Sequence, residues 1–125
     1  MDKKFGTVLN CMDGRTQISV TKWIKENYNV DYVDLITEPG IDKVLSKDCW
    51  SENERLRKSV LISVNAHKSN VVAVVGHYDC AANPVCYEKH LEDIEASVSR
   101  VKSWDLPVTV IGLWVDEFWN VHVVD

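Results

Sequence analysis

The stretch "VVAVVGHYDC", residues 71–80, decides the fold. Its first six residues form a continuous, mostly β-branched apolar run, which is typical of a strand buried on both faces of a sheet. Three polar residues, His77, Asp79 and Cys80, follow where the chain leaves that strand. The stretch therefore predicts a mostly parallel sheet covered by helices, with reactive side chains beyond the carboxyl end of one of its central strands.

The rest of the chain alternates between strand and helix patterns. The predicted strands lie at residues 5–9, 31–40, 71–76, 107–115 and 118–125. Helical spacing of apolar residues predicts helices at 18–29, 51–70 and 85–104. We therefore expect an α/β fold in a single domain over residues 1–125. Its central sheet would have about four parallel strands and an antiparallel C-terminal strand, flanked by helices.

Composition and charge exclude several classes of protein. The 125 residues are 46% apolar and 26% charged, as in ordinary globular proteins, and the net charge of -5 argues against a nucleic-acid partner. No apolar run approaches the length of a membrane-spanning helix, and the N-terminus lacks the apolar segment of a signal peptide. We expect a cytoplasmic protein whose four cysteines bind a metal, act in catalysis or lie buried, rather than form disulfides.

A second polar motif, "CMDGR" at residues 11–15, follows the first predicted strand. It places Cys11, Asp13 and Arg15 at alternating positions in one turn. In open parallel sheets, ligands bind beyond the carboxyl ends of the strands, where the strand order reverses. If the strands at 5–9 and 71–76 are neighbours there, the two motifs meet in one site.

The combined motifs indicate a metal site. Two thiols and one imidazole, from Cys11, His77 and Cys80, form the soft ligand set that selects zinc, and three protein ligands leave a fourth position for water. Asp13 either completes the site as a fourth ligand or orients that water while Arg15 holds it by pairing. A surface ion pair that only braces the turn is the third alternative.

A cysteine-dependent phosphatase is another interpretation of "CMDGR", in which the loop would wrap a phosphate. The signature of that class has about five residues between cysteine and arginine to supply the cradling backbone N–H groups. Here Cys11 and Arg15 enclose three, and Asp13 would repel a phosphate. We therefore set this interpretation aside.

With both motifs in place, the sequence resembles the β-class carbonic anhydrases. Cys-x-Asp-x-Arg after the first strand and Gly-His-x-x-Cys after a hydrophobic strand form the paired signature of that family, here "CMDGR" and "VVAVVGHYDC". The likeness covers most of the chain and includes the closing "VTVIGLWVDEFWNVHVV". The resemblance implies a zinc-dependent enzyme in which a zinc-bound hydroxide hydrates carbon dioxide reversibly to bicarbonate. It also implies a homodimer or higher homo-oligomer.

The resemblance also assigns roles to single residues. The implied zinc ligands are Cys11, His77 and Cys80. The implied catalytic pair is Asp13 and Arg15, with Asp13 still open as a fourth ligand. The candidate substrate-binding positions are Gly40 and Ala81. At both places the chain departs from the family, with Glu-Pro-Gly where Asn-Ala-Gly is common, and alanine where glycine is usual.

Two alternatives stay open beside carbon dioxide hydration. The same site can be expected to hydrolyse carbonyl sulfide or carbon disulfide, which relatives of this fold do. Alternatively, the chain is a catalytically weak zinc-binding structural or sensing module, in which Asp13 closes a four-ligand site.

The other cysteines and histidines are expected to carry no chemistry. Cys49 and Cys86 are predicted to be small buried apolar side chains, and His67 and His90 to be solvated on charged helix faces. His122 is expected to be an edge-strand residue, with proton transfer as the weaker alternative.

Two patterns concern the helix starts. Ser51 followed by Glu54 matches a capping box. Asp79 is expected either to cap the following helix or to adjust the surroundings of the metal ligands.

Overall fold

A computed structural model describes residues 2–124 and contains one five-stranded sheet with the strand order β2-β1-β3-β4-β5. The strands are β1 (Phe5–Asn10), β2 (Tyr32–Thr37), β3 (Val71–His77), β4 (Thr109–Val115) and β5 (Val121–Val124). The helices are α1 (Gly14–Tyr28), α2 (Ile41–Ser46), α3 (Trp50–Ala66) and α4 (Tyr87–Lys102). The first four strands are parallel and β5 is antiparallel to β4, which confirms the predicted fold class.

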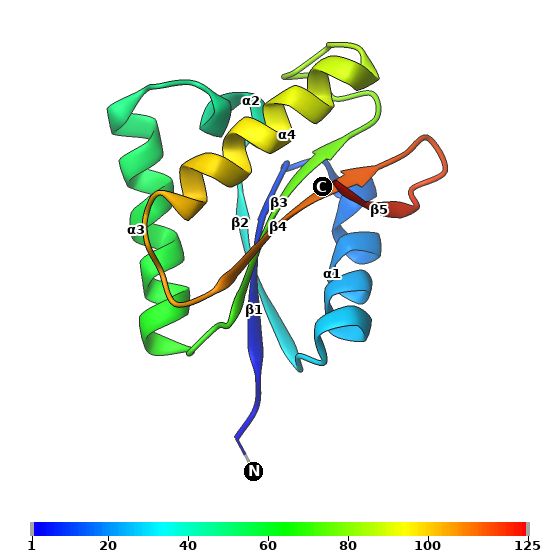
Figure 1. Cartoon of the computed structure of the whole chain (residues 1–125). Coiled ribbons are helices and arrows are strands. Elements are labelled where there is room, and N and C mark those ends of the chain that lie inside the picture. The colour runs from blue at the N-terminus through cyan, green and yellow to red at the C-terminus, as the bar shows by residue number, and fades with distance from the viewer. Residues whose placement is uncertain (1, 125) are drawn as a thin grey trace.

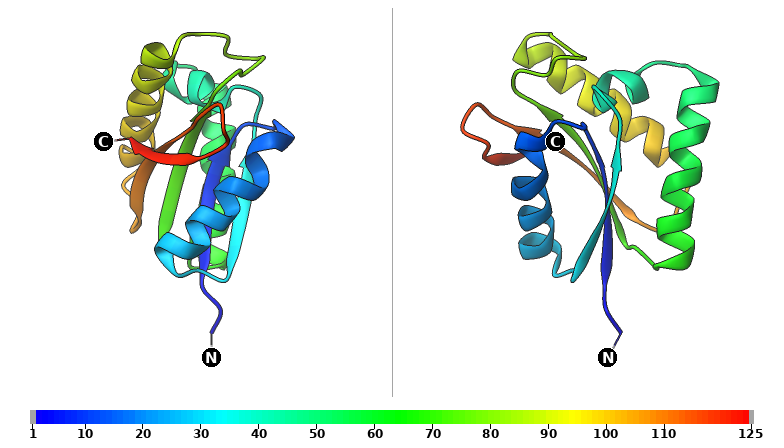
Figure 2. Two further views of the ribbon diagram at one scale, coloured as in Figure 1. Left: turned by 90° about the vertical axis from the view of Figure 1, so that its right-hand side faces the viewer. Right: turned by 180° about the vertical axis from the view of Figure 1, so that it is seen from behind.

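The helices form two layers on the sheet (Figures 1 and 2). Helix α1 covers one face, while α2, α3 and α4 cover the other. Every residue of β3 is buried, because this strand lies at the middle of the sheet between both layers. Its β-branched run therefore supplies apolar side chains to both faces, as the sequence predicts.

Each face of the sheet has its own apolar core. Val72 and Val74 of β3 pack with Leu9 under the α3 and α4 layer. The alternate residues Ala73 and Val75 pack with α1 on the other face. Burying one such valine or leucine stabilises the fold by about 1.5–3 kcal/mol, so this alternation fixes the register of the central strand.

The strand order reverses between β1 and β3. From β1 the chain crosses to β2 on one side, and from β3 it crosses to β4 on the other, so the turns after β1 and β3 meet at the carboxyl edge of the sheet. The two polar motifs of the sequence lie in these turns. No helix in the described part of the chain is long and apolar enough to cross a membrane.

Gly76 lets α2 and α4 approach the central strand closely. A Cβ atom at this position would lie 2.7 Å from Oδ2 of Asp42 and 2.8 Å from Cδ1 of Ile94. A side chain at position 76 would therefore displace both helices from β3.

Asp42 belongs to a buried polar group between α2 and α4. Its carboxylate lies 2.7 Å from Nδ1 of His90 and accepts a hydrogen bond of 3.1 Å from Asn83, which also donates to Asp93. The prediction that His90 is solvated is wrong, because its side chain is only 2% exposed. The carboxylate of Asp42, 48 residues earlier in the chain, gives the buried imidazole a hydrogen-bond partner and so reduces the free-energy cost of burying it.

The starts of the helices differ from the sequence patterns. Helix α1 begins at Gly14 with Asp13 as its N-cap, four residues earlier than predicted. The capping-box prediction is wrong, because α3 begins at Trp50 and Ser51 lies inside it. Asp79 does not cap the following helix either, because α4 begins only at Tyr87.

The two further cysteines are not the buried side chains that the sequence predicts. Cys86 is exposed and Cys49 is partly exposed, each at the residue before a helix. His67 is partly exposed, as expected, and its Nδ1 lies 2.7 Å from Oδ2 of Asp34.

Candidate metal centre

Cys11, His77 and Cys80 lie together at the carboxyl edge of the sheet. Cys11 directly follows β1, His77 is the last residue of β3, and Cys80 lies in the turn after it. Their ligand atoms are within 4.8 Å of one another and all three residues are buried. This group could hold a metal ion.

His77 presents one particular nitrogen to the group. Its Nδ1 lies 2.7 Å from the backbone carbonyl oxygen of Tyr78. Because a carbonyl can only accept, Nδ1 carries the hydrogen, and Nε2 keeps a free lone pair. Nε2 is buried and has no hydrogen-bond partner within residues 2–124, which would cost about 1–3 kcal/mol if nothing bound there. A metal ion bound by the group would satisfy this atom.

A backbone N–H stabilises the sulfur of Cys11. The N–H of Gly40 lies 3.5 Å from Cys11 Sγ, which brings the turn after β2 into the site. Gly40 has φ of 58°, and a Cβ atom there would lie 3.1 Å from Ala82. Glycine is therefore required at this position, and its backbone N–H donates to the sulfur of Cys11.

The thiols of Cys11 and Cys80 shift each other's pKa. The Sγ atoms of Cys11 and Cys80 are 3.9 Å apart. The neighbouring Cys80 thiol lowers the pKa of Cys11 well below its usual range, whereas the Cys11 thiolate and burial raise the pKa of Cys80 far above it. Two adjacent buried thiolates would repel each other, so only a cation between them allows both to ionise.

The charge of Cys11 also acts on His77. Burial alone would lower the pKa of His77, but the Cys11 sulfur, and after it the Tyr78 carbonyl, raise the pKa above its ordinary value. The three donors are thus electrostatically coupled before any ion binds.

Asp13 is paired with Arg15 and lies outside the group of three metal donors. The Arg15 guanidinium donates from Nε to Oδ1 at 3.0 Å and from Nη2 to Oδ2 at 2.7 Å. Oδ1 also accepts the backbone N–H of Arg15 at 2.9 Å, which caps α1. Arg15 lowers the pKa of Asp13 to about 2, so this carboxylate is ionised at neutral pH.

Two residues that sequence reasoning did not connect to this pair complete its surroundings. Arg15 also contacts Asp79, through Nη1 to Oδ2 at 3.3 Å and Nη2 to the backbone oxygen at 3.1 Å. The guanidinium lies over the ring of Trp119, with its central carbon 4.6 Å from the ring centroid. Nothing in the spacing of these residues indicates the contacts, because Trp119 comes from the loop between β4 and β5.

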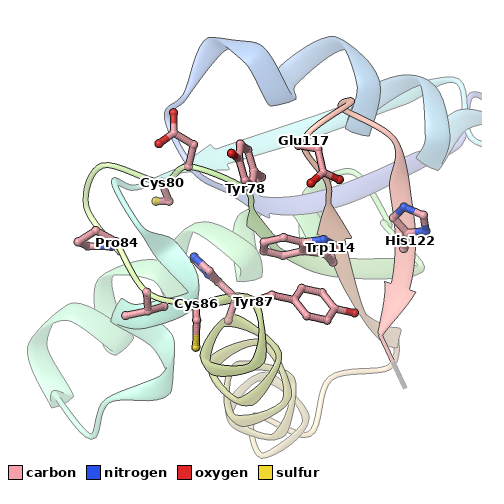
Figure 3. A pocket seen from close by; sticks show the side chains of 11 residues that line it. Tyr78, Cys80, Pro84, Cys86, Tyr87, Trp114, Glu117 and His122 are labelled. Atoms are coloured by element: carbon pink, nitrogen blue, oxygen red, sulfur yellow. The ribbon is translucent and has the colours of Figure 1, made fainter.

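A cleft of about 730 Å³ opens beside Cys80 (Figure 3). Its walls come from the turn after β3, the start of α4, β4, the loop after β4, and β5. Trp114 stands between Glu117 and Tyr87 in Figure 3, and His122 lines the side formed by β5. Among the described residues, neither Gly40 nor Ala81 lines this cleft.

His122 is held at the rim of the cleft. Its Nε2 lies 2.6 Å from Oδ2 of Asp116, the residue that follows β4. Two backbone N–H groups, of Phe118 and Asn120, donate to the other carboxylate oxygen at 2.9 Å each. These bonds hold the Asp116 pKa below its usual range, with His122 as the largest cause.

The known proteins that this chain resembles are carbonic anhydrases. A family model described as "Putative carbonic anhydrase" matches residues 1–125. No curated protein sequence matches the chain. Among solved structures, a carbonic anhydrase from Glaciozyma antarctica superposes with a TM-score of 0.67 at 16% identity, over 98% of this chain and 82% of that one. The β-carbonic anhydrase isoform I from Trichomonas vaginalis gives 0.66 at 15% identity, over 98% and 83%.

Proposed function

The chain belongs to this carbonic anhydrase family, and on that basis we propose that it hydrates carbon dioxide reversibly to bicarbonate with a zinc ion held by Cys11, His77 and Cys80. The observation that carries the proposal is the buried Nε2 of His77. This atom has no partner in the described part of the chain and belongs to the same group of ligand atoms as two sulfurs.

The donor set fits zinc. Two thiolates that bind one tetrahedral zinc ion at about 2.3 Å lie about 3.8 Å from each other. The two sulfur atoms here are 3.9 Å apart. Two thiolates and a neutral imidazole also balance the charge of a dication, so the buried site carries no net charge when it is filled. When bound, zinc supplies the Lewis acidity that makes water a nucleophile near neutral pH.

Asp13 and Arg15 would orient the reacting water. Because the pKa of Asp13 is about 2, its carboxylate remains a hydrogen-bond acceptor at any pH where the protein works. Arg15 engages both carboxylate oxygens, which fixes the plane of Asp13 and restrains it from turning toward the metal donors. This pairing favours a site with an open fourth position over the closed structural module.

We also propose that the chain assembles as a homodimer. Large apolar side chains near Arg15 are exposed: Ile18 is 83% exposed and Phe118 is 76% exposed. Exposed apolar surface around a binding site is typical of an interface between subunits. Sedimentation analysis of the purified chain tests this, and a single species of 14.3 kDa at all concentrations would contradict it.

Stopped-flow measurement of carbon dioxide hydration with a pH indicator tests the proposed reaction. The zinc-loaded chain should accelerate hydration, and the Cys80→Ser variant should not. Release of hydrogen sulfide from carbonyl sulfide or carbon disulfide, measured on the same preparation, would identify the alternative hydrolase. A chain that binds one zinc ion and catalyses none of these reactions would be the structural or sensing module.

A further inference from the structure

The loop between β4 and β5 is built around the side chain of Asp116. One carboxylate oxygen accepts two loop N–H groups and the other binds His122, as described above, while the Asp116 carbonyl accepts the N–H of Trp119 at 2.9 Å. Trp119 has φ of 64°, a left-handed conformation that a residue other than glycine rarely adopts. The loop therefore fixes the backbone that carries the indole ring.

The indole ring of Trp119 lies against Arg15, whose guanidinium contacts two carboxylates. Arg15 contacts Asp13 on one side and Asp79 on the other, and its own side chain is 45% exposed. The ion pair with Asp79 is a single contact that is open to water and contributes little, so the bidentate pair with Asp13 is the main ionic restraint on the guanidinium. A cation over a tryptophan face adds a directional contact on a third side.

We propose that Trp119 is a positioning residue, whose ring holds the Arg15 guanidinium in the orientation that grips both oxygens of Asp13. The ring restricts the guanidinium to one orientation, in which Nε and Nη2 face the Asp13 carboxylate while Nη1 faces the Asp79 carboxylate and Nη2 also reaches the Asp79 backbone oxygen. Without the ring, the Arg15 guanidinium would turn part of the time toward Asp79, whose side chain is 68% exposed. The carboxylate of Asp13 would then no longer be held in one orientation. The catalytic consequence rests on the proposed function, whereas the restraint on Arg15 does not.

Three single variants separate stacking from general stability. Trp119→Ala removes the ring, Trp119→Phe keeps an aromatic face, and Trp50→Ala makes the same truncation at an exposed tryptophan of α3. In the zinc-loaded protein, Trp119→Ala should lower kcat for carbon dioxide hydration about tenfold, the size of one partly exposed cation–π contact. KM should stay unchanged, because Trp119 does not line the cleft. Trp119→Phe and Trp50→Ala should retain most of kcat.

Nuclear magnetic resonance gives a readout that is independent of catalysis. The Nε–H signal of Arg15 should be sharp and slow to exchange with solvent in the wild type and in Trp119→Phe, because Nε–H is bonded to Asp13. In Trp119→Ala it should broaden and exchange faster. Adding Asp79→Asn to Trp119→Ala removes the competing carboxylate and should restore part of the signal and of kcat.

The outcomes separate this inference from the proposed function. Unchanged Nε–H exchange in a folded Trp119→Ala protein, or equal losses in Trp119→Ala and Trp119→Phe, would overturn the role of the ring. If Trp119→Ala does not fold, the Trp119→Phe and Asp79→Asn single variants decide: Trp119→Phe should keep the Arg15 signal, and Asp79→Asn should sharpen it. A wild type without any hydration activity would refute the proposed function, while the Arg15 signal would still decide how Arg15 is held.

Discussion

The sulfur atoms of Cys11 and Cys80 lie 3.9 Å apart although 69 residues separate them in the chain. This spacing is well beyond the roughly 2.05 Å of a disulfide bond and matches two ligands of one tetrahedral ion. The adjacent parallel strands β1 and β3 create it, since each cysteine lies just beyond the carboxyl end of one strand. The sheet therefore places the metal donors, and the metal would in turn join the two turns.

Replacing one sulfur should empty the site. We expect Cys80→Ser to reduce bound zinc from about one ion per chain to a small fraction, and to lower the Tm, because metal binding energy is also folding energy. Zinc content by atomic emission and a thermal scan measure both effects. Cys86→Ser is the matched control, since Cys86 lines the same cleft but lies outside the group of three. Equal zinc loss in both variants would contradict the assignment.

Removing the charge of Asp13 should separate catalysis from metal binding. Asparagine can still cap α1 through its side-chain oxygen, so Asp13→Asn should keep the fold and the zinc. It cannot act as an anionic acceptor beside Arg15, and we expect kcat to fall by about a hundredfold or more. Stopped-flow kinetics on protein of measured zinc content test this. Wild-type turnover would reject a catalytic role for the carboxylate.

Zinc binding should release protons from different groups in acidic and in alkaline solution. Cys11 has a lowered pKa and is already ionised in the metal-free protein, whereas the raised pKa of Cys80 keeps its proton until zinc displaces it. The raised pKa of His77 adds a second released proton at lower pH. Release from the protein side chains should therefore fall from about two protons per ion in mildly acidic solution to about one in alkaline solution, where ionisation of the zinc-bound water adds one more. Affinity should rise with pH. An indicator titration that gives about three protons at high pH would show that both thiols keep their protons in the metal-free protein.

Close packing at Gly76 should make it intolerant of a methyl group. We expect Gly76→Ala to lower the free energy of unfolding by about 1–3 kcal/mol, because Asp42 and Ile94 would have to move. Gly14→Ala, where no atom lies within 4 Å of the added Cβ, should be neutral or stabilise by up to about 1 kcal/mol. Urea unfolding of both variants gives the comparison, and equal stabilities would argue against the tight approach of the helices.

The buried pair of Asp42 and His90 should be costly to break. Asp42→Ala leaves the buried imidazole of His90 without its carboxylate partner, and we expect a loss of about 1–3 kcal/mol in the free energy of unfolding. Asp48→Ala removes a carboxylate that is 94% exposed and should change stability little. A small effect of Asp42→Ala in urea unfolding would mean that the packing of α2 against α4 does not depend on this pair.

Local patterns predict the sheet and the positions of the three candidate metal ligands, because both depend on short stretches of sequence. The continuous apolar run of β3 is typical of a central strand. The two polar motifs lie at the carboxyl ends of β1 and β3. The meeting of Cys11 with His77 and Cys80 required one further assumption, that β1 and β3 are neighbours, and the strand order confirms it.

Contacts between distant segments account for the errors. His90 appears on a charged helix as a solvated residue, and only the approach of Asp42 from α2 shows that it is buried. Asp79 resembles a helix cap by its position after β3, but it caps no helix, because α4 begins eight residues later at Tyr87. Its carboxylate contacts Arg15 instead. The apolar spacing of α1 begins only at Ile18, whereas the Asp13 side chain caps the helix at Gly14, so the helix starts before its apolar pattern does.

The exposed thiol of Cys86 gives the protein a natural attachment point for a reporter. Cys11 and Cys80 are buried and Cys49 is only partly exposed, so a bulky maleimide dye should reach Cys86 first. Because Cys86 lines the cleft together with Cys80, a fluorophore there would sit at the entrance to the metal centre. Its emission could then record ligands entering the cleft, without any engineered cysteine.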